Sequence, residues 1–190
     1  MSTASADALR QIALEHFARH GFEGASLQHI AAEAGLSKSS VLYHFDSKEA
    51  LLDAALRPSL TALRGLVERL QGLPADADRG AFVADFVDFL FEHRLAVATI
   101  VNHGTSLTGT AAVEEADALV RTLAQRIDPR AGSALDAMRF GVGLAGATFV
   151  LVAAERWAVE RLPEHEARRL LTLVLADLLL PASAPERQPA

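Results

Sequence analysis

Apolar residues recur every three or four positions along almost the whole chain, and no segment sustains the apolar–polar alternation of a strand. In residues 7–20, for example, Leu9, Ile12, Ala13, His16 and Phe17 share one helical face. Short stretches rich in glycine, proline or aspartate separate such segments. The sequence therefore predicts an all-α fold of about nine helices.

The predicted helices and their ends follow from this spacing. Gly21 and Gly35 should end the first two helices, and Ser26 and Ser37 should cap the second and third. A glycine-rich stretch at 104–112 should be a loop. The predicted helices cover residues 7–20, 27–34, 38–45, 48–70, 80–93, 95–102, 113–127, 134–161 and 164–180.

The fourth predicted helix is the longest of the N-terminal half. Asp46 and Glu49 have capping-box spacing at its start, and Pro58 should kink it. We place the domain boundary near this proline. After the last helix, the tail from Pro181 should be disordered.

Composition excludes several classes of protein. The chain is 51% hydrophobic, so it is not mainly disordered, and it has no cysteine for disulfides, thiolate metal sites or cysteine nucleophiles. Its first residues do not read as a secretory signal, and its longest uncharged run, 140–154, is shorter than the roughly 18 residues of a membrane span. We expect a cytoplasmic protein with no metal and no cofactor.

Charge alone argues mildly against nucleic acid as a partner. The net charge is −6, and residues 1–57 hold five Lys or Arg against seven Asp or Glu. The only two lysines, Lys38 and Lys48, however, lie ten residues apart in one short segment. A DNA-binding surface here would have to concentrate its positive charge at these positions.

Two short predicted helices joined by a turn at Gly35 form a helix-turn-helix arrangement. Ala31 is small where the helices approach, and Leu36 and Val41 can fill the core between them. The outward residues of the second helix are Lys38, Ser39, Ser40, Tyr43 and His44, which can reach phosphates and base edges, while Leu42 could meet a thymine methyl group. Lys48 begins the next helix, where a phosphate is also favoured.

The stretch FARHGFEGASLQHIAAEAGLSKSSVLYHFDSKEALLDAAL resembles the N-terminal motif of the TetR/AcrR-type transcriptional regulators, over about residues 9–56. The resemblance implies a helix-turn-helix DNA-binding domain (1–57), a ligand-binding and dimerisation domain (58–180) and a disordered tail (181–190). Many members have a tyrosine where this chain has Leu42. The DNA contacts that it implies are Ser26, Gln28, Lys38, Ser39, Ser40, Tyr43, His44 and Lys48.

The resemblance also implies a small-molecule effector, bound in the C-terminal domain. An apolar stripe of Phe82, Phe86, Phe89 and Leu90 is core by default, but part of it could line a cavity for a hydrophobic or aromatic ligand. The candidate effector residues are Phe86, Phe89, His93, Ile100, His103, Leu123, Phe149 and Trp157. No constellation of catalytic residues is apparent, so we do not expect an enzyme.

The last two predicted helices combine small residues with many apolar ones, more than a monomer readily covers. Pairing with a second copy would form a four-helix bundle, whereas a hairpin core within one chain is the alternative. The residues concerned are Gly141, Gly143, Ala145, Gly146, Leu170, Leu171, Val174, Leu175, Leu178 and Leu179. We expect a homodimeric repressor that binds double-stranded, palindromic operator DNA; a ligand-binding module without DNA binding is the rival.

Overall fold

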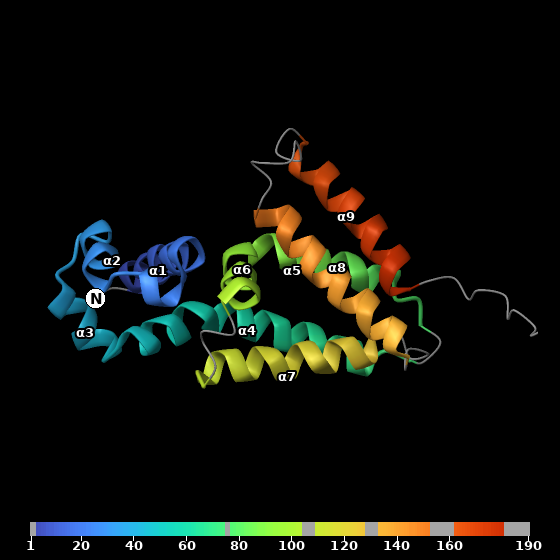
Figure 1. Cartoon of the computed structure of the whole chain (residues 1–190), viewed down its shortest axis with the longest axis horizontal. Coiled ribbons are helices and arrows are strands. Elements are labelled where there is room, and N and C mark those ends of the chain that lie inside the picture. The colour runs from blue at the N-terminus through green and yellow to red at the C-terminus, as the bar shows by residue number, and fades with distance from the viewer. Residues whose placement is uncertain (1–2, 75–76, 104–108, 128–132, 153–161, 181–190) are drawn as a thin grey trace, which may run out of the picture. The chain divides into compact units, whose positions relative to one another are not determined.

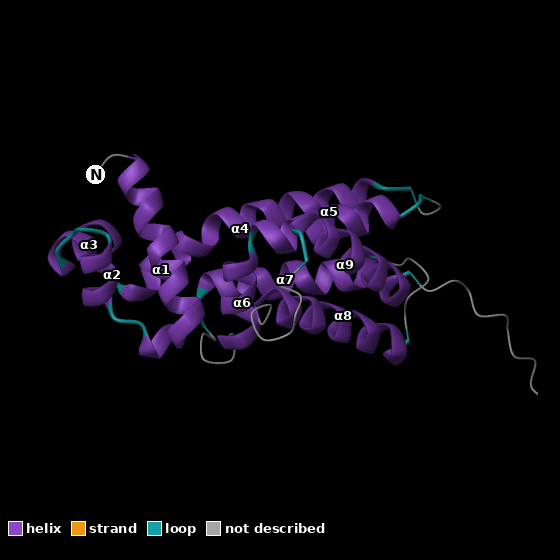
Figure 2. Ribbon diagram, turned by 90° about the horizontal axis from the view of Figure 1, so that it is seen from above, coloured by secondary structure: helices purple, strands orange, loops and turns teal. Residues whose placement is uncertain are grey.

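The computed structural model describes residues 3–74, 77–103, 109–127, 133–152 and 162–180, and every regular element within these ranges is a helix (Figure 2). The predicted all-α fold is confirmed. The helices are α1 (Thr3–Gly24), α2 (Leu27–Glu33), α3 (Lys38–Phe45), α4 (Lys48–Gly72), α5 (Gly80–Glu92), α6 (Arg94–His103), α7 (Ala111–Arg126), α8 (Ala134–Val152) and α9 (Glu164–Leu179).

Most helix ends lie where glycine and serine predicted them. Gly21 interrupts α1 with φ 70° and ψ 171°, a conformation that only glycine adopts readily. Ser37 caps α3 by accepting a hydrogen bond from the Ser40 N–H. Ser26 occupies the predicted N-cap position of α2, and its side chain makes no capping hydrogen bond there.

Helix α4 starts at Lys48 as predicted, but its cap lies one residue later than predicted. Asp46 has φ 53° and ends α3, so it is not available to cap the next helix. Ser47 is the cap instead, since its Oγ accepts from the Ala50 N–H at 3.1 Å. The helix then continues through Pro58 to Gly72.

The chain divides into two compact units. One contains residues 1–65 and 93–120, and the other contains residues 66–92 and 121–190, so α4 and α7 each contribute to both. This division follows packing. The boundary at residue 57 between the proposed DNA-binding and ligand-binding domains is a different division, and it stays a prediction. The tail from Pro181, predicted to be disordered, lies outside the described residues.

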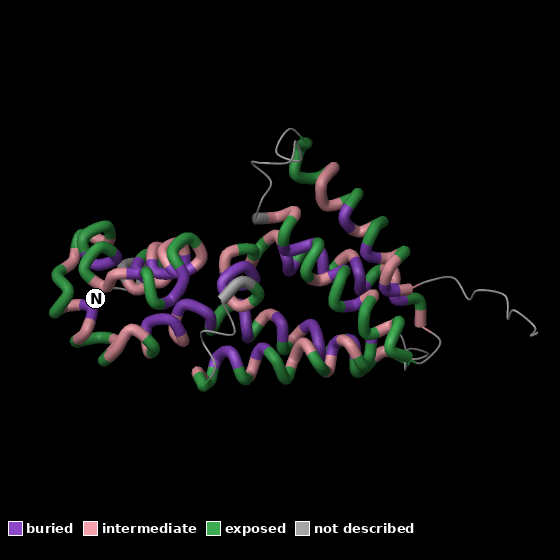
Figure 3. Tube along the Cα trace, in the orientation of Figure 1, coloured by how far each residue is buried: buried purple, intermediate pink, exposed green. Residues whose placement is uncertain are grey.

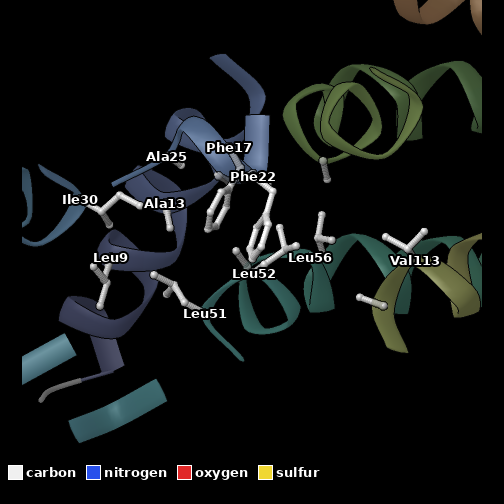
Figure 4. Packing of buried hydrophobic residues seen from close by; sticks show 14 of the residues in the cluster. Leu9, Ala13, Phe17, Phe22, Ala25, Ile30, Leu51, Leu52, Leu56 and Val113 are labelled. Atoms are coloured by element: carbon white, nitrogen blue, oxygen red, sulfur yellow. The ribbon is translucent and has the colours of Figure 1, made fainter. Parts of the chain in front are cut away.

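The core of the first unit fixes the small N-terminal helices on α4. The rings of Phe17 and Phe22 lie 5.8 Å apart and face Leu52 of α4 (Figure 4). Helices α6 and α7 also contribute. The buried residues of the cluster include Leu9, Ala13, Ala25, Ile30, Ala31, Val41, Leu51, Leu56, Ala96, Val113 and Ala116. Burial of this many apolar side chains is what holds helices as short as α2 and α3 in place.

In the second unit, α5, α8 and α9 pack together, with α8 and α9 side by side (Figure 1). Arg168 of α9 joins α9 to α5: it pairs with Asp88 at 2.6 Å and lies 4.5 Å from the ring centre of Phe91. It also pairs with Glu164. Partial burial disfavours its charge, but the hydrogen bonds to Glu164 and Asp88 outweigh this and raise the pKa of Arg168.

Helix α8 leaves an apolar surface uncovered. Met138, Val142 and Phe149 are 70%, 63% and 55% exposed, and exposed positions recur along the helix (Figure 3). The window 134–151 is long and apolar enough to span a membrane by length and composition, although it includes Asp136 and Arg139. Only 22% of that window is buried within the chain.

Candidate nucleic-acid interface

The turn between α2 and α3 is built around Gly35, which has φ +68°. The N–H of Leu36 donates to the Ala31 carbonyl at 2.8 Å, and the N–H of Gly35 donates to Ala32 at 3.0 Å. This is the hydrogen-bond pattern by which a glycine in the left-handed region ends a helix. Leu36 then packs against the core, which fixes the direction in which α3 leaves the turn.

A group of three serine hydroxyls lies at the start of α3. Ser37 Oγ lies 2.9 Å from Ser39 Oγ and 2.8 Å from Ser40 Oγ, in addition to accepting from the Ser40 N–H. Ser39 and Ser40 were both predicted to contact DNA, and each hydroxyl keeps further hydrogen-bonding capacity. Ser37 therefore orients the two hydroxyls that the sequence singled out.

The remaining surface of α3 is polar and exposed, whereas Val41 anchors the helix from the opposite side and is fully buried. Tyr43 is 83% exposed, and its ring meets the His44 ring edge-on at 5.2 Å between centres. Lys38 and His44 are exposed as well, and Leu42 is half-buried. Most of the side chains predicted to read DNA on this helix are thus accessible.

Helix α2 contributes less surface. Gln28 is exposed and Ser26 is half-buried. The helix is fixed to α1 by a hydrogen bond between the Glu33 carboxylate and His16 Nε2 at 2.8 Å, with the His16 side chain mostly covered. That contact explains why a polar residue, His16, lies on the inner face of the first helix, where the sequence predicted it.

Lys48 makes contacts that the sequence did not predict. Its ammonium donates to the carbonyl oxygens of Ala25 at 3.0 Å and Glu23 at 3.4 Å, and lies 4.5 Å from the ring centre of Phe22. The residue is half-buried. The group predicted to contact phosphate is therefore engaged with the protein's own backbone in the absence of DNA.

The described candidate effector residues come from both compact units. His93 and Ile100 belong to the first unit, where His93 Nδ1 lies 3.1 Å from Ser59 Oγ and Ile100 packs against the core cluster. In the second unit, Phe86 and Phe89 are buried and stack at 6.3 Å.

The other four effector candidates differ in their surroundings. Leu123 is fully buried, whereas Phe149 is exposed on α8. His103 is the last residue of α6, and its side chain lies outside the described part of the chain, as does Trp157.

A small cavity of about 10 Å³, room for about one water molecule, lies in the second unit, among the end of α7, the start of α8 and the end of α9. None of the predicted effector residues whose side chains the structure describes lines it. Its walls are apolar apart from Asp136 and Arg139, which are paired at 3.4 Å. The lining residues are Ala124, Ile127, Asp136, Arg139, Phe140, Leu178 and Leu179.

Residues 9–55, which contain α2, α3 and most of α1, match the family of bacterial regulatory proteins described as the tetR family. By this match, residues 9–55 are similar to the TetR-family domain. The TetR-family domain of the HTH-type transcriptional regulator RutR from Escherichia coli K12 is similar: 47% identical over 58 residues, which span 30% of this chain and 27% of RutR. Relatives of this domain are transcriptional regulators and not enzymes.

Solved TetR-family structures share the fold along nearly the whole chain. A TetR-family regulator from Bordetella parapertussis 12822 has a TM-score of 0.69 at 18% identity, covering 97% of this chain and 100% of that one. AibR, solved in complex with isovaleryl coenzyme A and operator DNA, has a TM-score of 0.60 at 18% identity and covers 90% and 97%. At these identities the likeness is one of fold.

Some contacts could not be read from the sequence. Glu115 of α7 pairs with both Arg57 and Arg64 of α4, and no local pattern connects residues so distant in the chain. The exposed stripe on α8 could have been found, because Leu135, Met138, Val142 and Phe149 follow one another at helical spacing.

Proposed function

We propose that this chain is a cytoplasmic, ligand-responsive transcriptional repressor that binds a palindromic operator as a homodimer. The observation that carries the proposal is the exposed polar face of α3, held by the Gly35 turn and the Ser37 cap in a TetR-family domain. A short helix presented in this way fits the major groove of DNA.

The proposed contacts divide by chemistry. Lys38 neutralises phosphate, while Tyr43 and His44 lie one turn further along α3 and reach base edges or phosphates. Leu42 offers an apolar contact for a thymine methyl group. Ser26 and Gln28 of α2, together with Ser39 and Ser40, supply hydroxyl and amide hydrogen bonds to the backbone or the bases.

The proposed dimer forms through α8 and α9. In the single chain these helices already pack on each other through Gly143, Leu175 and Leu179, which supports part of the hairpin interpretation. They still leave an apolar surface exposed: Leu135, Met138, Gly141, Val142, Ala145, Gly146 and Phe149 on α8, and Leu170, Leu173 and Val174 on α9. Pairing with a second copy buries this surface in a four-helix bundle.

The proposed effector is a small hydrophobic or aromatic molecule, since most of the candidate residues are apolar or aromatic. Among the described residues of the second unit, the candidates are Phe86, Phe89, Leu123 and Phe149. Effector binding releases the repressor from DNA if the effector prefers a conformation in which the two recognition helices have a different spacing. Helix α4 connects the proposed effector domain to the DNA-binding domain and would transmit this change. AibR, which was solved with both a coenzyme A ester and operator DNA, provides a precedent on the same fold.

Operator binding is tested by selecting duplexes from a random pool with the wild-type protein, followed by fluorescence anisotropy on the selected and a scrambled duplex. We expect nanomolar-range specific binding. Tyr43→Ala should reduce the preference for the selected duplex, because Tyr43 is proposed to reach the bases. Failure to select any sequence would favour the rival function, a ligand-binding module without DNA binding.

The dimer is tested by analytical ultracentrifugation of Val142→Glu, which places a charge in the exposed apolar stripe. We expect the wild type to sediment as a dimer and the variant as a monomer with unchanged helix content by circular dichroism. Thr61→Glu, at an exposed position on α4, is the matched control and should stay dimeric. A monomeric wild type, or a dimeric Val142→Glu, would exclude this interface.

A further inference from the structure

Lys48 is placed unusually for a cation. It is the first residue of α4, where the positive end of the helix dipole disfavours a positive charge. Its ammonium nevertheless lies at the end of another helix, 3.4 Å from the Glu23 carbonyl in the last turn of α1. A helix C-terminus leaves carbonyl groups without intrahelical donors, and a cation there is favourable.

Helix α1 has no basic residue of its own in its last turn. Lys48 supplies that charge from a distant part of the chain. Its shorter hydrogen bond, 3.0 Å, goes to the carbonyl of Ala25, the residue directly before the N-cap position of α2. The Phe22 ring, 4.5 Å from the ammonium, adds a cation–π contact beside these carbonyls.

The acceptors of Lys48 belong to the turn that sets the direction of α2. Ala25 and Phe22 are buried in the core, so this turn is held firmly on one side. On the other side, Lys48 ties it to the first turn of α4, whose Leu51 and Leu52 are fully buried. A displacement of the first turn of α4 would break these hydrogen bonds or carry the turn with it.

We propose that Lys48 is a positioning residue that couples the start of α4 to the α1–α2 turn and so sets the orientation of the recognition helix α3. The inference rests on the proposed function of α3 in reading DNA. It assigns to Lys48 the role of holding the helix-turn-helix in its DNA-reading arrangement, in place of the phosphate contact expected from the sequence.

Lys38 is the matched control for this proposal. It is the only other lysine, it lies on the same small domain, and it is exposed, with no hydrogen bond or ion pair among the described residues. Replacing either lysine by methionine removes one positive charge and keeps a flexible apolar stem. The two roles then separate in the salt dependence of DNA binding.

The experiment measures anisotropy of wild type, Lys48→Met and Lys38→Met on a selected operator and on a scrambled duplex, across salt. We expect Lys48→Met to lose about tenfold in operator affinity, the order expected for two hydrogen bonds, with less loss on the scrambled duplex. The slope of log affinity against log salt should not change. Lys38→Met should weaken both duplexes and lower that slope by about one.

A second measurement needs no DNA. Amide hydrogen exchange in Ser26, Leu27 and Gln28 should be faster in Lys48→Met than in wild type, and unchanged in Lys38→Met, because only Lys48 holds this turn. Far-UV circular dichroism confirms that each variant is folded. If Lys48→Met unfolds, Lys48→Gln, which can still donate to one carbonyl, takes its place in both measurements.

The outcomes separate the two claims. A Lys48→Met variant with a reduced salt slope, an intact preference for the operator and unchanged exchange would make Lys48 a phosphate contact and overturn the proposal. If the wild type selects no operator, the proposed function fails, and slower or unchanged exchange in Lys48→Met would independently overturn the coupling role.

Discussion

The Leu175 Cδ2 atom on α9 lies 3.2 Å from the position that a Cβ atom on Gly143 of α8 would occupy. Leu179 and Leu178 lie at 3.6 Å and 3.8 Å from the same position. Leu175 is 1% exposed, so it has little room to move away. The absence of a side chain at residue 143 is therefore what allows α8 and α9 to approach this closely.

Gly143→Ala should destabilise the protein by about 1 kcal/mol, because the crowding of Leu175 exceeds the gain in helix propensity. Leu175→Ala should lower the free energy of unfolding by about 2–5 kcal/mol, because it leaves a cavity. The double variant should be more stable than the sum of the two losses predicts, since each change relieves the other. Urea unfolding of the wild type, the two single variants and the double variant, all at the same protein concentration, measures these free energies of unfolding. Strictly additive losses would contradict the close contact.

Ser37→Ala should lower stability by about 0.5–2 kcal/mol, because it removes the hydrogen bond that Ser37 Oγ accepts from the Ser40 N–H. Operator binding should weaken as well, since the same oxygen orients Ser39 and Ser40. Ser26→Ala is the matched control: it removes a serine at an N-cap position whose side chain makes no capping bond. If Ser37→Ala and Ser26→Ala lowered the thermal unfolding temperature equally, the capping role of Ser37 would be wrong.

Gly35→Ala should cost about 1–2 kcal/mol, entirely through backbone conformation. No atom lies within 4 Å of a Cβ added there, so crowding makes no contribution, whereas φ +68° disfavours any residue with a side chain. Gly35→Asn should lose less, because asparagine tolerates the left-handed region better than alanine does. The comparison is made by chemical denaturation, and an asparagine variant no better than alanine would point to another cause.

Glu49→Gln should destabilise the protein at pH 7, and its difference from wild type should shrink as the pH falls. The backbone N–H of Glu49 and the Ser47 hydroxyl lower the pKa of this carboxyl from 4.5. A lowered pKa contributes stability that is present above pH 4.5 and is lost as the pH falls through the folded-state value. Because the group is exposed, the effect should be small.

Thermal unfolding of Glu49→Gln across pH 3–7 measures this effect. A Glu49→Gln deficit that did not shrink at all between pH 7 and pH 3 would mean that the loss does not come from the ionised carboxylate.

The sequence indicated the helical elements well because their signals are local. The spacing of Leu9, Ala13 and Phe17 predicted the inner face of α1, and Gly35 predicted the turn between α2 and α3. Capping was less certain. Asp46 and Ser47 are both good caps by type, and the choice between them depended on which one had already been used to end α3.

The candidate site was predictable in part for the same reason. Tyr43 lies about half a helical turn from Val41, so the burial of Val41 leaves Tyr43 exposed on α3. Lys48 was placed correctly at the start of α4, but its acceptors at Glu23 and Ala25 are more than twenty residues away in the chain. The effector candidates rested on residue type alone, and the structure distributes the described ones over two units.

By itself, the sequence determined that this chain is helical, where most of its helices begin and end, and which family its first domain resembles, because periodicity, glycine conformation and capping act over a few residues. Tertiary structure alone decided which partner each polar side chain took: Lys48 the carbonyl of Ala25, and Arg168 the carboxylate of Asp88. These choices depend on which polar atoms the packing of the helices brings within about 3 Å of one another. The spacing of residues along a single helix does not determine which distant residues come that close.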